Sequence, residues 1–282
     1  MSVFARRVAI KVGGSMLKNE ESFESLAEGI VSYLQNHPEI ERAYIIVSAR
    51  KGMTDKTINT LAPGDEAELF RRALIVGEDE ETDTVRNEKP WDRPSWALSL
   101  LWGEIESAYL LKEAMSRLGF PASVVTQLGL FPIVAEGRYL QAQVDLKASR
   151  RRFTAFDRAC SKTGRRAVIL SGFGAVNPDG DPVLLGRNAS DYVAAVVSRL
   201  DTRVDLIIFL KDTGGLYDGF TTERQRLIEQ TNVSELLMMS LGRALDRRVL
   251  DLVRCDFRIT GLSFDEGGTF VRPDSPVRRG VR

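Results

Sequence analysis

The 282-residue sequence contains a single histidine, His37, and only two cysteines, Cys160 and Cys255. One histidine argues against a histidine-based catalytic triad or a histidine zinc site, and its position beside Pro38 is typical of a helix end. The two cysteines lie far apart and at no metal-ligand spacing. The chemistry of this protein is therefore expected to depend on other side chains.

Net charge and long hydrophobic runs are also missing. The 39 Lys and Arg residues balance 39 Asp and Glu residues, so nothing attracts the chain as a whole to nucleic acid or to an anionic membrane. No apolar run approaches the roughly 20 residues of a membrane span, and no signal-peptide pattern opens the sequence. We expect a cytoplasmic protein with neither nucleic acid nor a membrane as its partner.

The sequence does contain an alternation of apolar strands and amphipathic helices. Val8-Ala9-Ile10-Lys11-Val12 predicts a first strand, a helix follows from about Ser22, and Tyr44-Ile45-Ile46-Val47 predicts a second strand. Further strands are expected at residues 121–125, 166–170, 204–210 and 257–262, and further helices at 95–118, 193–200 and 234–253. This order is typical of parallel pairing. The expected fold class is α/β, with a mainly parallel central sheet sandwiched by helices.

Residues 62–95 interrupt the alternation. They include the acidic run Gly77-Glu78-Asp79-Glu80-Glu81 and show little periodicity, which is typical of a mobile lid or of a solvated loop. Residues 265–282 are expected to form a polar tail.

Five polar segments follow predicted strands or turns, namely residues 11–15, 48–54, 171–174, 185–192 and 211–217. In parallel α/β proteins, ligands bind at the carboxyl ends of the strands. Gly13-Gly14 would let the backbone approach phosphate oxygens, with the positive charge of Lys11 beside them. Ser190 or Asp191 is expected to cap the helix at 193–200, whose free N–H groups suit an anion. Each segment alone has a plain structural interpretation, but the five in order predict a phosphoryl-binding site.

The ordered set resembles the amino acid kinase superfamily, and within it the catalytic domain of aspartate kinases. Residues 11–15 resemble the family's Lys-Phe-Gly-Gly-Thr opening, and residues 47–54 its Val-Ser-Ala-x-x-Gly-x-Thr segment. Gly103-Glu104 with Ser107 resembles Gly-Glu-x-x-Ser. Residues 185–192 are similar to Leu-Gly-Arg-Gly-Gly-Ser-Asp-Tyr, and residues 211–217 to Thr-Asp-Val-x-Gly-x-Tyr. The resemblance covers residues 8–262.

The resemblance implies an ATP-dependent kinase that phosphorylates a carboxylate of aspartate or a close relative. Lys11 would stabilise the phosphoryl group in flight, and Asp191 would orient that lysine. Arg187 would pair with a substrate carboxylate and Glu104 with its ammonium group. The implied substrate-binding residues are Ser48, Thr54, Glu104, Phe173, Arg187 and Ser190. The implied nucleotide-binding residues are Lys11, Gly13, Gly14, Ser15, Lys211, Asp212 and Tyr217.

The resemblance also implies a three-layer catalytic domain over residues 1–264. Its amino-acid-binding lobe would span about 1–200 and its nucleotide-binding lobe about 201–264. Mg²⁺ would arrive with ATP and be held mostly by phosphate oxygens, without a protein metal site. A homodimer is expected from the family. Aspartate kinases usually continue into regulatory domains, for which this sequence has no room, so we expect no built-in feedback control.

Three departures from the family pattern keep alternatives open. Asn188 and Ala189 replace two glycines, Lys211 replaces a threonine, and Arg243 stands near the position of a lysine in the family's Gly-Ala-Lys-Val-Leu segment. Because no lysine follows Lys211, either Lys211 or Arg243 is predicted to supply the missing positive charge. The alternatives are a kinase for another small acid, a phosphonate or a nucleoside monophosphate, as in uridylate kinases, or a non-catalytic homologue that only binds such ligands.

Overall fold

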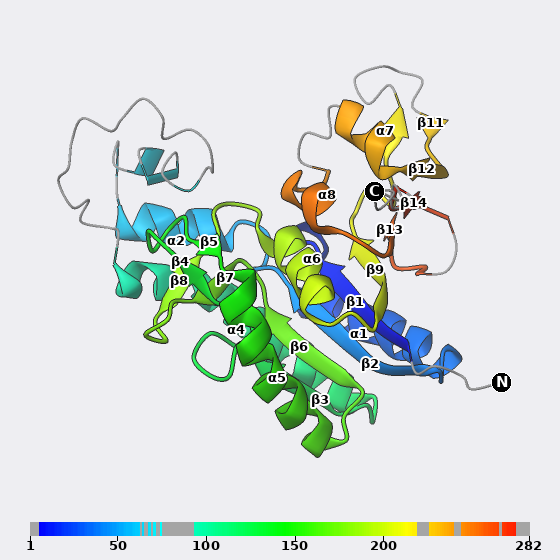
Figure 1. Cartoon of the computed structure of the whole chain (residues 1–282), viewed down its shortest axis with the longest axis horizontal. Coiled ribbons are helices and arrows are strands. Elements are labelled where there is room, and N and C mark those ends of the chain that lie inside the picture. Colours follow the sequence, from blue (N-terminus) through cyan, green and yellow to red (C-terminus); the bar gives the residue numbers. More distant parts are fainter. Residues whose placement is uncertain are drawn as a thin grey trace, which may run out of the picture.

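An eight-stranded sheet runs through the centre of the molecule, in the order β12-β14-β13-β9-β1-β2-β6-β3 (Figure 1). The computed structural model describes residues 6–62, 64, 67–68, 70–71, 74, 93–218, 226–239, 244–264 and 267–274. The strands of the sheet are β1 (Arg6–Val12), β2 (Ile40–Val47), β3 (Ala122–Val125), β6 (Ala167–Ser171), β9 (Val204–Leu210), β12 (Gln230–Asn232), β13 (Asp256–Thr260) and β14 (Thr269–Arg272). Only β13 and β14 pair antiparallel among these neighbours. The predicted α/β fold with a mainly parallel sheet is confirmed.

The carboxyl ends of the central strands lie in register at one edge of the sheet. Val12 of β1 pairs with Val47 of β2 on one side and with Leu210 of β9 on the other. Val47 in turn pairs with Ser171 of β6. The polar segments that follow these four strands therefore leave from the same edge, as the sequence predicts.

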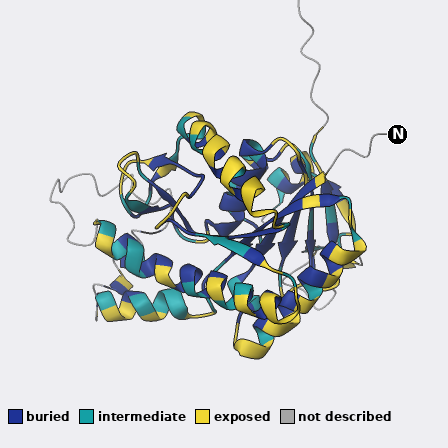
Figure 2. Cartoon of the chain, turned by 90° about the horizontal axis from the view of Figure 1, so that it is seen from below, coloured by how far each residue is buried: buried dark blue, intermediate teal, exposed yellow. Residues whose placement is uncertain are grey.

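Helices cover both faces of the sheet. In β1, Val8, Ile10 and Val12 contribute to one hydrophobic core, together with α1 (Glu20–Asn36) and the second half of α4 (Pro94–Arg117). Ala9 contributes to the other core, together with α5 (Leu146–Thr163) and α6 (Ser190–Leu200). Figure 2 shows the buried strands between helices whose outer faces are exposed. Strands covered on both faces account for the continuous apolar runs of the sequence.

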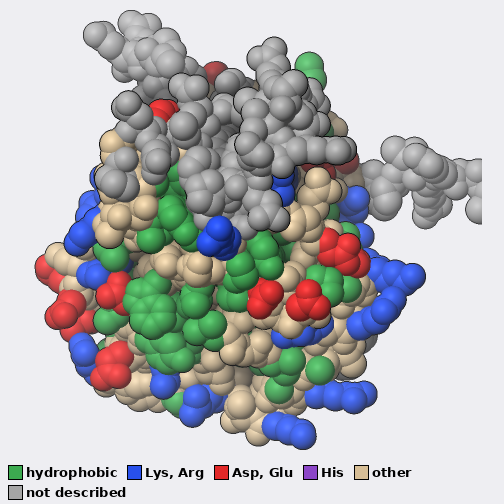
Figure 3. Space-filling model, turned by 90° about the vertical axis from the view of Figure 1, so that its left-hand side faces the viewer, with side chains coloured by type: hydrophobic (Ala, Val, Ile, Leu, Met, Phe, Trp, Pro, Cys, Tyr) green, Lys and Arg blue, Asp and Glu red, His purple; other side chains and the backbone are tan. Residues whose placement is uncertain are grey.

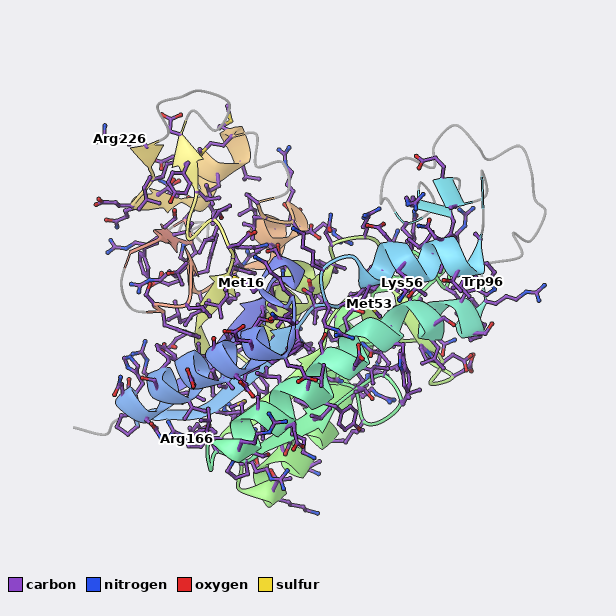
Figure 4. The ribbon with its side chains drawn as sticks, turned by 180° about the vertical axis from the view of Figure 1, so that it is seen from behind. Met16, Met53, Lys56, Trp96, Arg166 and Arg226 are labelled. Atoms are coloured by element: carbon purple, nitrogen blue, oxygen red, sulfur yellow. The ribbon has the colours of Figure 1, made fainter. Side chains whose placement is uncertain are left out.

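Short elements complete the fold. They are the 3₁₀ turn η1 (Gly14–Met16), α2 (Met53–Leu61), α7 (Val233–Met238) and α8 (Arg248–Leu252), with the paired strands β4 (Ala135–Glu136) and β5 (Gln143–Val144), β7 (Gly174–Val176) and β8 (Pro182–Leu184), and β10 (Tyr217–Asp218) and β11 (Arg226–Leu227). Figure 4 shows α2, which carries Met53 and Lys56, lying along α4, which carries Trp96. Most of the predicted lid or loop at 62–95, and Arg243, lie outside the described residues.

Two expectations about the C-terminal part of the chain are wrong. The helix predicted over residues 234–253 is two short helices, α7 and α8, and α7 already ends at Met238. Part of the predicted polar tail is β14, which returns after Gly267 and Gly268 (φ 69° and 81°) to pair with β13. Side chains alternate between the two faces of a strand, and in β14 every second residue, Thr269 and Val271, is fully buried.

The described surface carries both signs of charge. Figure 3, viewed from the left-hand side of Figure 1, shows a patch of hydrophobic side chains with acidic and basic side chains on either side. Among the described helices, none is long and apolar enough to cross a lipid bilayer.

A buried charge network lies at the amino ends of the strands, opposite the carboxyl edge. Arg7 of β1 is 3% exposed, and its Nη1 donates to Asp157 of α5 and to Asp201 after α6, each at 2.6 Å. The hydroxyl of Tyr44 also donates to Asp201 (2.7 Å). The network joins the helices of one face to the two central strands, because each partner comes from a different element.

Removing Arg7 should destabilise the fold strongly, because Asp201 would keep its buried charge and lose a main partner. We expect Arg7→Ala to lower the free energy of unfolding by about 3–5 kcal/mol. Arg6→Ala is the matched control, since Arg6 pairs with Asp205 at the surface and exposed pairs contribute less than about 1 kcal/mol. Urea denaturation measures both variants, and equal losses would contradict a special role for the network.

Candidate active site

The carboxylate of Asp191 joins two lysines at the carboxyl edge of the sheet. The Nζ of Lys11, at the end of β1, lies 2.7 Å from Asp191 Oδ1, and the Nζ of Lys211, directly after β9, lies 2.7 Å from Oδ2. Lys11 and Asp191 are almost completely buried. The backbone N–H of Asp246 also donates to Oδ2 (3.3 Å). One carboxylate between two ammonium groups leaves a net positive charge beside the strand ends, which suits a phosphoryl group.

Burial and charge oppose each other in this triad. Burial lowers the pKa of Lys11 to about 8, although the Asp191 carboxylate favours the charged ammonium form and Lys211 disfavours it. Burial alone would raise the pKa of Asp191, but the two lysines hold that pKa below its ordinary value. Asp191 is therefore ionised at neutral pH and keeps both lysines in place.

The start of α6 differs from the expected cap. The helix begins at Ser190 with Ala189 at its N-cap, so neither Ser190 nor Asp191 is the capping residue. Both side chains are engaged elsewhere, Asp191 by the lysines and Ser190 by Ser48. Asn188 takes the left-handed conformation (φ 64°), which asparagine tolerates, whereas Ala189 is right-handed (φ −66°). The loop thus forms without the two glycines of the family pattern.

The turn after β1 brings backbone close to Lys11. A Cβ on Gly13 would lie 3.8 Å from Lys11 Nζ, and a Cβ on Gly14 would lie 2.6 Å from the carbonyl oxygen of Ala49, so Gly14 has no room for a side chain. Ser15 lies in the same 3₁₀ turn, η1. These residues are the part of the site that suits phosphate oxygens.

Hydroxyl groups tie three strand exits together. Ser48, which follows β2, donates to the carbonyl oxygen of Val12 and lies 2.9 Å from the Ser190 hydroxyl. Gly172, which follows β6, packs so tightly that a Cβ there would lie 2.8 Å from Ser190 Cβ. The next residue, Phe173, is buried with φ 68°, in the left-handed region, and its carbonyl oxygen accepts from the backbone N–H of Leu185. The sequence-predicted residues Ser48 and Ser190 therefore meet, and Phe173 directly follows the glycine that packs against Ser190.

Glu104 is a buried carboxyl group with unused hydrogen-bonding capacity. It lies on α4 and accepts a hydrogen bond from the backbone of Ala49, while its Oε2 has no partner among the described residues. Burial raises the pKa of Glu104 to about 8, against the opposing charge of Lys11. Gly103 allows this approach, because a Cβ there would lie 2.8 Å from Ala49 Cβ. A buried oxygen without a partner suits a cationic ligand group.

Arg187 has a protein partner that the sequence did not suggest. Its Nη2 lies 3.1 and 3.3 Å from the two carboxylate oxygens of Asp55, which follows Thr54 in the first turn of α2. The acidic residue directly after Thr54 is visible in the sequence, but nothing there shows that it reaches the loop before α6. The pair places Thr54 and Arg187 on the same side of the site.

The two remaining predicted residues lie on the segment that follows β9. Asp212 is exposed in a turn, and Tyr217 is half-buried at the start of β10, where it pairs with Leu227. Lys211, at the start of the same segment, reaches Asp191. A role of Asp212 and Tyr217 in nucleotide binding stays a prediction.

Fold and site together define a class: an α/β protein with two lysines joined by one carboxylate at the carboxyl ends of its parallel strands. A model of the amino acid kinase family matches residues 6–254. The chain belongs to the amino acid kinase family. Over 96 residues it is 34% identical to a bifunctional aspartokinase/homoserine dehydrogenase of Haemophilus influenzae, covering 34% of this chain and 11% of that protein. Over 117 residues it is 29% identical to bifunctional aspartokinase/homoserine dehydrogenase 2 of Escherichia coli, covering 42% of this chain and 14% of that protein.

Solved structures share the fold. Aspartokinase III of E. coli in complex with aspartate and ADP has a TM-score of 0.72 at 17% identity, covering 95% of this chain and 65% of that one. Carbamate kinase of Giardia lamblia bound to AMP-PNP has a TM-score of 0.59 at 12% identity, covering 96% of this chain and all of that one. The chain thus matches only a small part of the curated relatives and about two thirds of aspartokinase III.

The unusual pKa of Glu104 predicts a pH-dependent stability. A carboxyl group with a folded-state pKa of about 8 stabilises the fold in its neutral form, and that stability is lost as the pH rises from the unfolded value towards 8. Glutamine cannot ionise and does not undergo this loss. The melting temperature of Glu104→Gln relative to that of the wild type should therefore be higher at pH 9 than at pH 5. Thermal unfolding at both pH values measures this gain. Glu113→Gln, an exposed substitution on the same helix, is the control, and an equal gain there would contradict the assignment.

Proposed function

We propose that the protein transfers the γ-phosphoryl group of ATP to a carboxylate of aspartate or a closely related amino acid, giving an acyl phosphate. The observation that carries this proposal is the Lys11–Asp191–Lys211 triad at the carboxyl edge of the sheet, with both ammonium groups 2.7 Å from the carboxylate. The triad lies beside the Gly13-Gly14 turn on one side and the Ser48–Ser190 pair on the other.

The arrangement fits this chemistry because a carboxylate is already a nucleophile and needs no strong base. A carboxylate oxygen forms the new bond to the γ-phosphorus while the bond from phosphorus to the β,γ-bridging oxygen breaks and ADP departs. Catalysis then consists of in-line positioning and charge neutralisation. Lys11 and Lys211 supply the positive charge. The backbone N–H of Gly14 is proposed to bind phosphate oxygens, since the N–H of Gly13 already donates to the carbonyl oxygen of Leu210 (3.1 Å).

Mg²⁺ is proposed to enter with ATP and to shield its phosphate charge. The described residues contain no cluster of three or more His, Cys, Asp or Glu side chains that could hold a metal ion, and both oxygens of Asp191 already contact lysines. This donor set fits an ion that is held mainly by phosphate oxygens.

Recognition of the amino acid is assigned to the side of the site lined by α2 and α4. The unpartnered Oε2 of Glu104 suits the ammonium group, and Arg187 suits a carboxylate. The further contacts proposed are Ser48, Thr54, Phe173 and Ser190. The nucleotide is proposed to lie against residues 13–15 and the segment carrying Lys211, Asp212 and Tyr217. We further propose a cytoplasmic homodimer.

A kinase for another small acid or for a nucleoside monophosphate is the second candidate. Lys211 favours it, because threonine is usual at this position in aspartate kinases. The retained Glu104, Arg187 and Ser190 favour the aspartate assignment. The presence of both lysines on Asp191 argues against a homologue that only binds ligands.

Trapping of acyl phosphate by hydroxylamine tests the proposal. With ATP and Mg²⁺, the wild type should form a hydroxamate from aspartate, and Lys11→Ala should lose at least about 100-fold in rate, because it removes charge stabilisation of the transition state. The acceptor panel includes N-acetylated and β-substituted aspartates, glutamate and UMP. ADP formed only with UMP would move the protein to the nucleotide kinases. ATP binding without turnover of any acceptor would favour the non-catalytic homologue.

Lys211 should be the second cation of phosphoryl transfer. Since its Nζ shares Asp191 with Lys11, we expect Lys211→Ala to lower kcat by about 10²-fold and to weaken ATP binding. Lys211→Arg should restore part of the activity because it keeps the charge. Steady-state kinetics on both variants measure this, and unchanged turnover and ATP affinity in Lys211→Ala would reject the role.

A further inference from the structure

The arginine assigned to the substrate, Arg187, already forms an ion pair with a carboxylate of the protein itself. Both oxygens of Asp55 face Arg187 Nη2, at 3.1 and 3.3 Å. The two side chains remain 47% and 32% exposed, so the pair lies at the mouth of the site and not in its core. Exposed ion pairs contribute less than about 1 kcal/mol, and a ligand carboxylate can therefore replace one partner at little energetic cost.

The backbone of Arg187 is held by its surroundings. Arg187 stands between Gly186 and Asn188, both in the left-handed conformation, and its own N–H donates to the carbonyl oxygen of Leu74 (2.6 Å). Asp55 lies in the first turn of α2, and its side chain is more exposed than that of Arg187. The carboxylate is therefore the partner that a ligand carboxylate would replace.

A second cation contacts the same carboxylate oxygen of Asp55 as Arg187 does. The Nε of Arg71 lies 3.6 Å from Asp55 Oδ1. If a ligand took Arg187, Asp55 would still face a positive charge and would not be left without a partner. Displacement thus exchanges one ion pair for another.

We propose that Asp55 is an affinity-lowering residue that occupies Arg187 in place of the substrate carboxylate until the acceptor displaces it. The proposal rests on the proposed function in one respect, namely that Arg187 binds a carboxylate of the acceptor. If Asp55 leaves Arg187 free only about a fifth of the time, the apparent dissociation constant of the acceptor rises about fivefold. The same factor applies to every carboxylate that uses Arg187, and phosphoryl transfer itself is not altered.

The test uses Asp55→Asn, which keeps the shape of the side chain and removes its charge. We expect the acceptor KM to fall about three- to fivefold, while kcat and the ATP KM change less than twofold. The matched control is Glu106→Gln. It removes the same charge from a neighbouring pair, in which Arg50 Nη2 lies 3.0 and 2.9 Å from the Glu106 oxygens, and its acceptor KM should stay within twofold. In an Arg187→Gln background, Asp55→Asn should have no effect on KM.

Each contrary result has a definite meaning. A higher KM in Asp55→Asn would show that Asp55 positions Arg187, and an equal fall in Glu106→Gln would show a general charge effect; either overturns the inference. Calorimetric titration of aspartate into wild type and Asp55→Asn measures binding without turnover. If the wild type shows no turnover, the proposed function alone is contradicted. If Asp55→Asn leaves aspartate binding unchanged, or if neither protein binds aspartate, the proposed displacement is contradicted.

Discussion

Two like charges, the ammonium groups of Lys11 and Lys211, are held at the same place by a single buried carboxylate. Without Asp191 these groups would repel each other in a site that burial already makes unfavourable for charge. The carboxylate comes from the first turn of α6, whereas the lysines come from two adjacent strands. The contact between the helix layer and the sheet is therefore also the contact that assembles the proposed phosphoryl site, so the site requires the correctly packed fold.

Buried charges are paired at one end of the sheet and incompletely paired at the other. At the amino ends, Arg7 meets Asp157 and Asp201, and the charges satisfy one another within the protein. At the carboxyl ends, Glu104 keeps an oxygen without a partner among the described residues, and the lysines outnumber the carboxylate between them. The first end stabilises the fold. The second retains unused hydrogen-bonding and electrostatic capacity, which is typical of functional sites.

Much of the fold could be predicted from local patterns. The strands β1, β2, β6 and β9 are apolar runs that end in polar, glycine-bearing segments, and the parallel register brings those segments together. Helix α5 gave no clear signal, because its arginine-rich sequence obscures the apolar stripe of Phe153, Phe156 and Cys160. The cap of α6 was mispredicted because tertiary partners engage Ser190 and Asp191. The Arg187–Asp55 pair joins residues 132 positions apart, and no local pattern encodes that contact.

The alternation of side chains along β1 has a consequence for how this sequence can change. Ile10 and Val12 enter one core, and Lys11, between them, points to the opposite side, where Asp191 lies. A one-residue insertion or deletion within the strand would exchange the two faces. It would place the lysine in the hydrophobic layer under α1 and an aliphatic side chain against the carboxylate. Natural variation in this strand is therefore restricted to substitutions that preserve its length, and the position of Lys11 and the core must be inherited together.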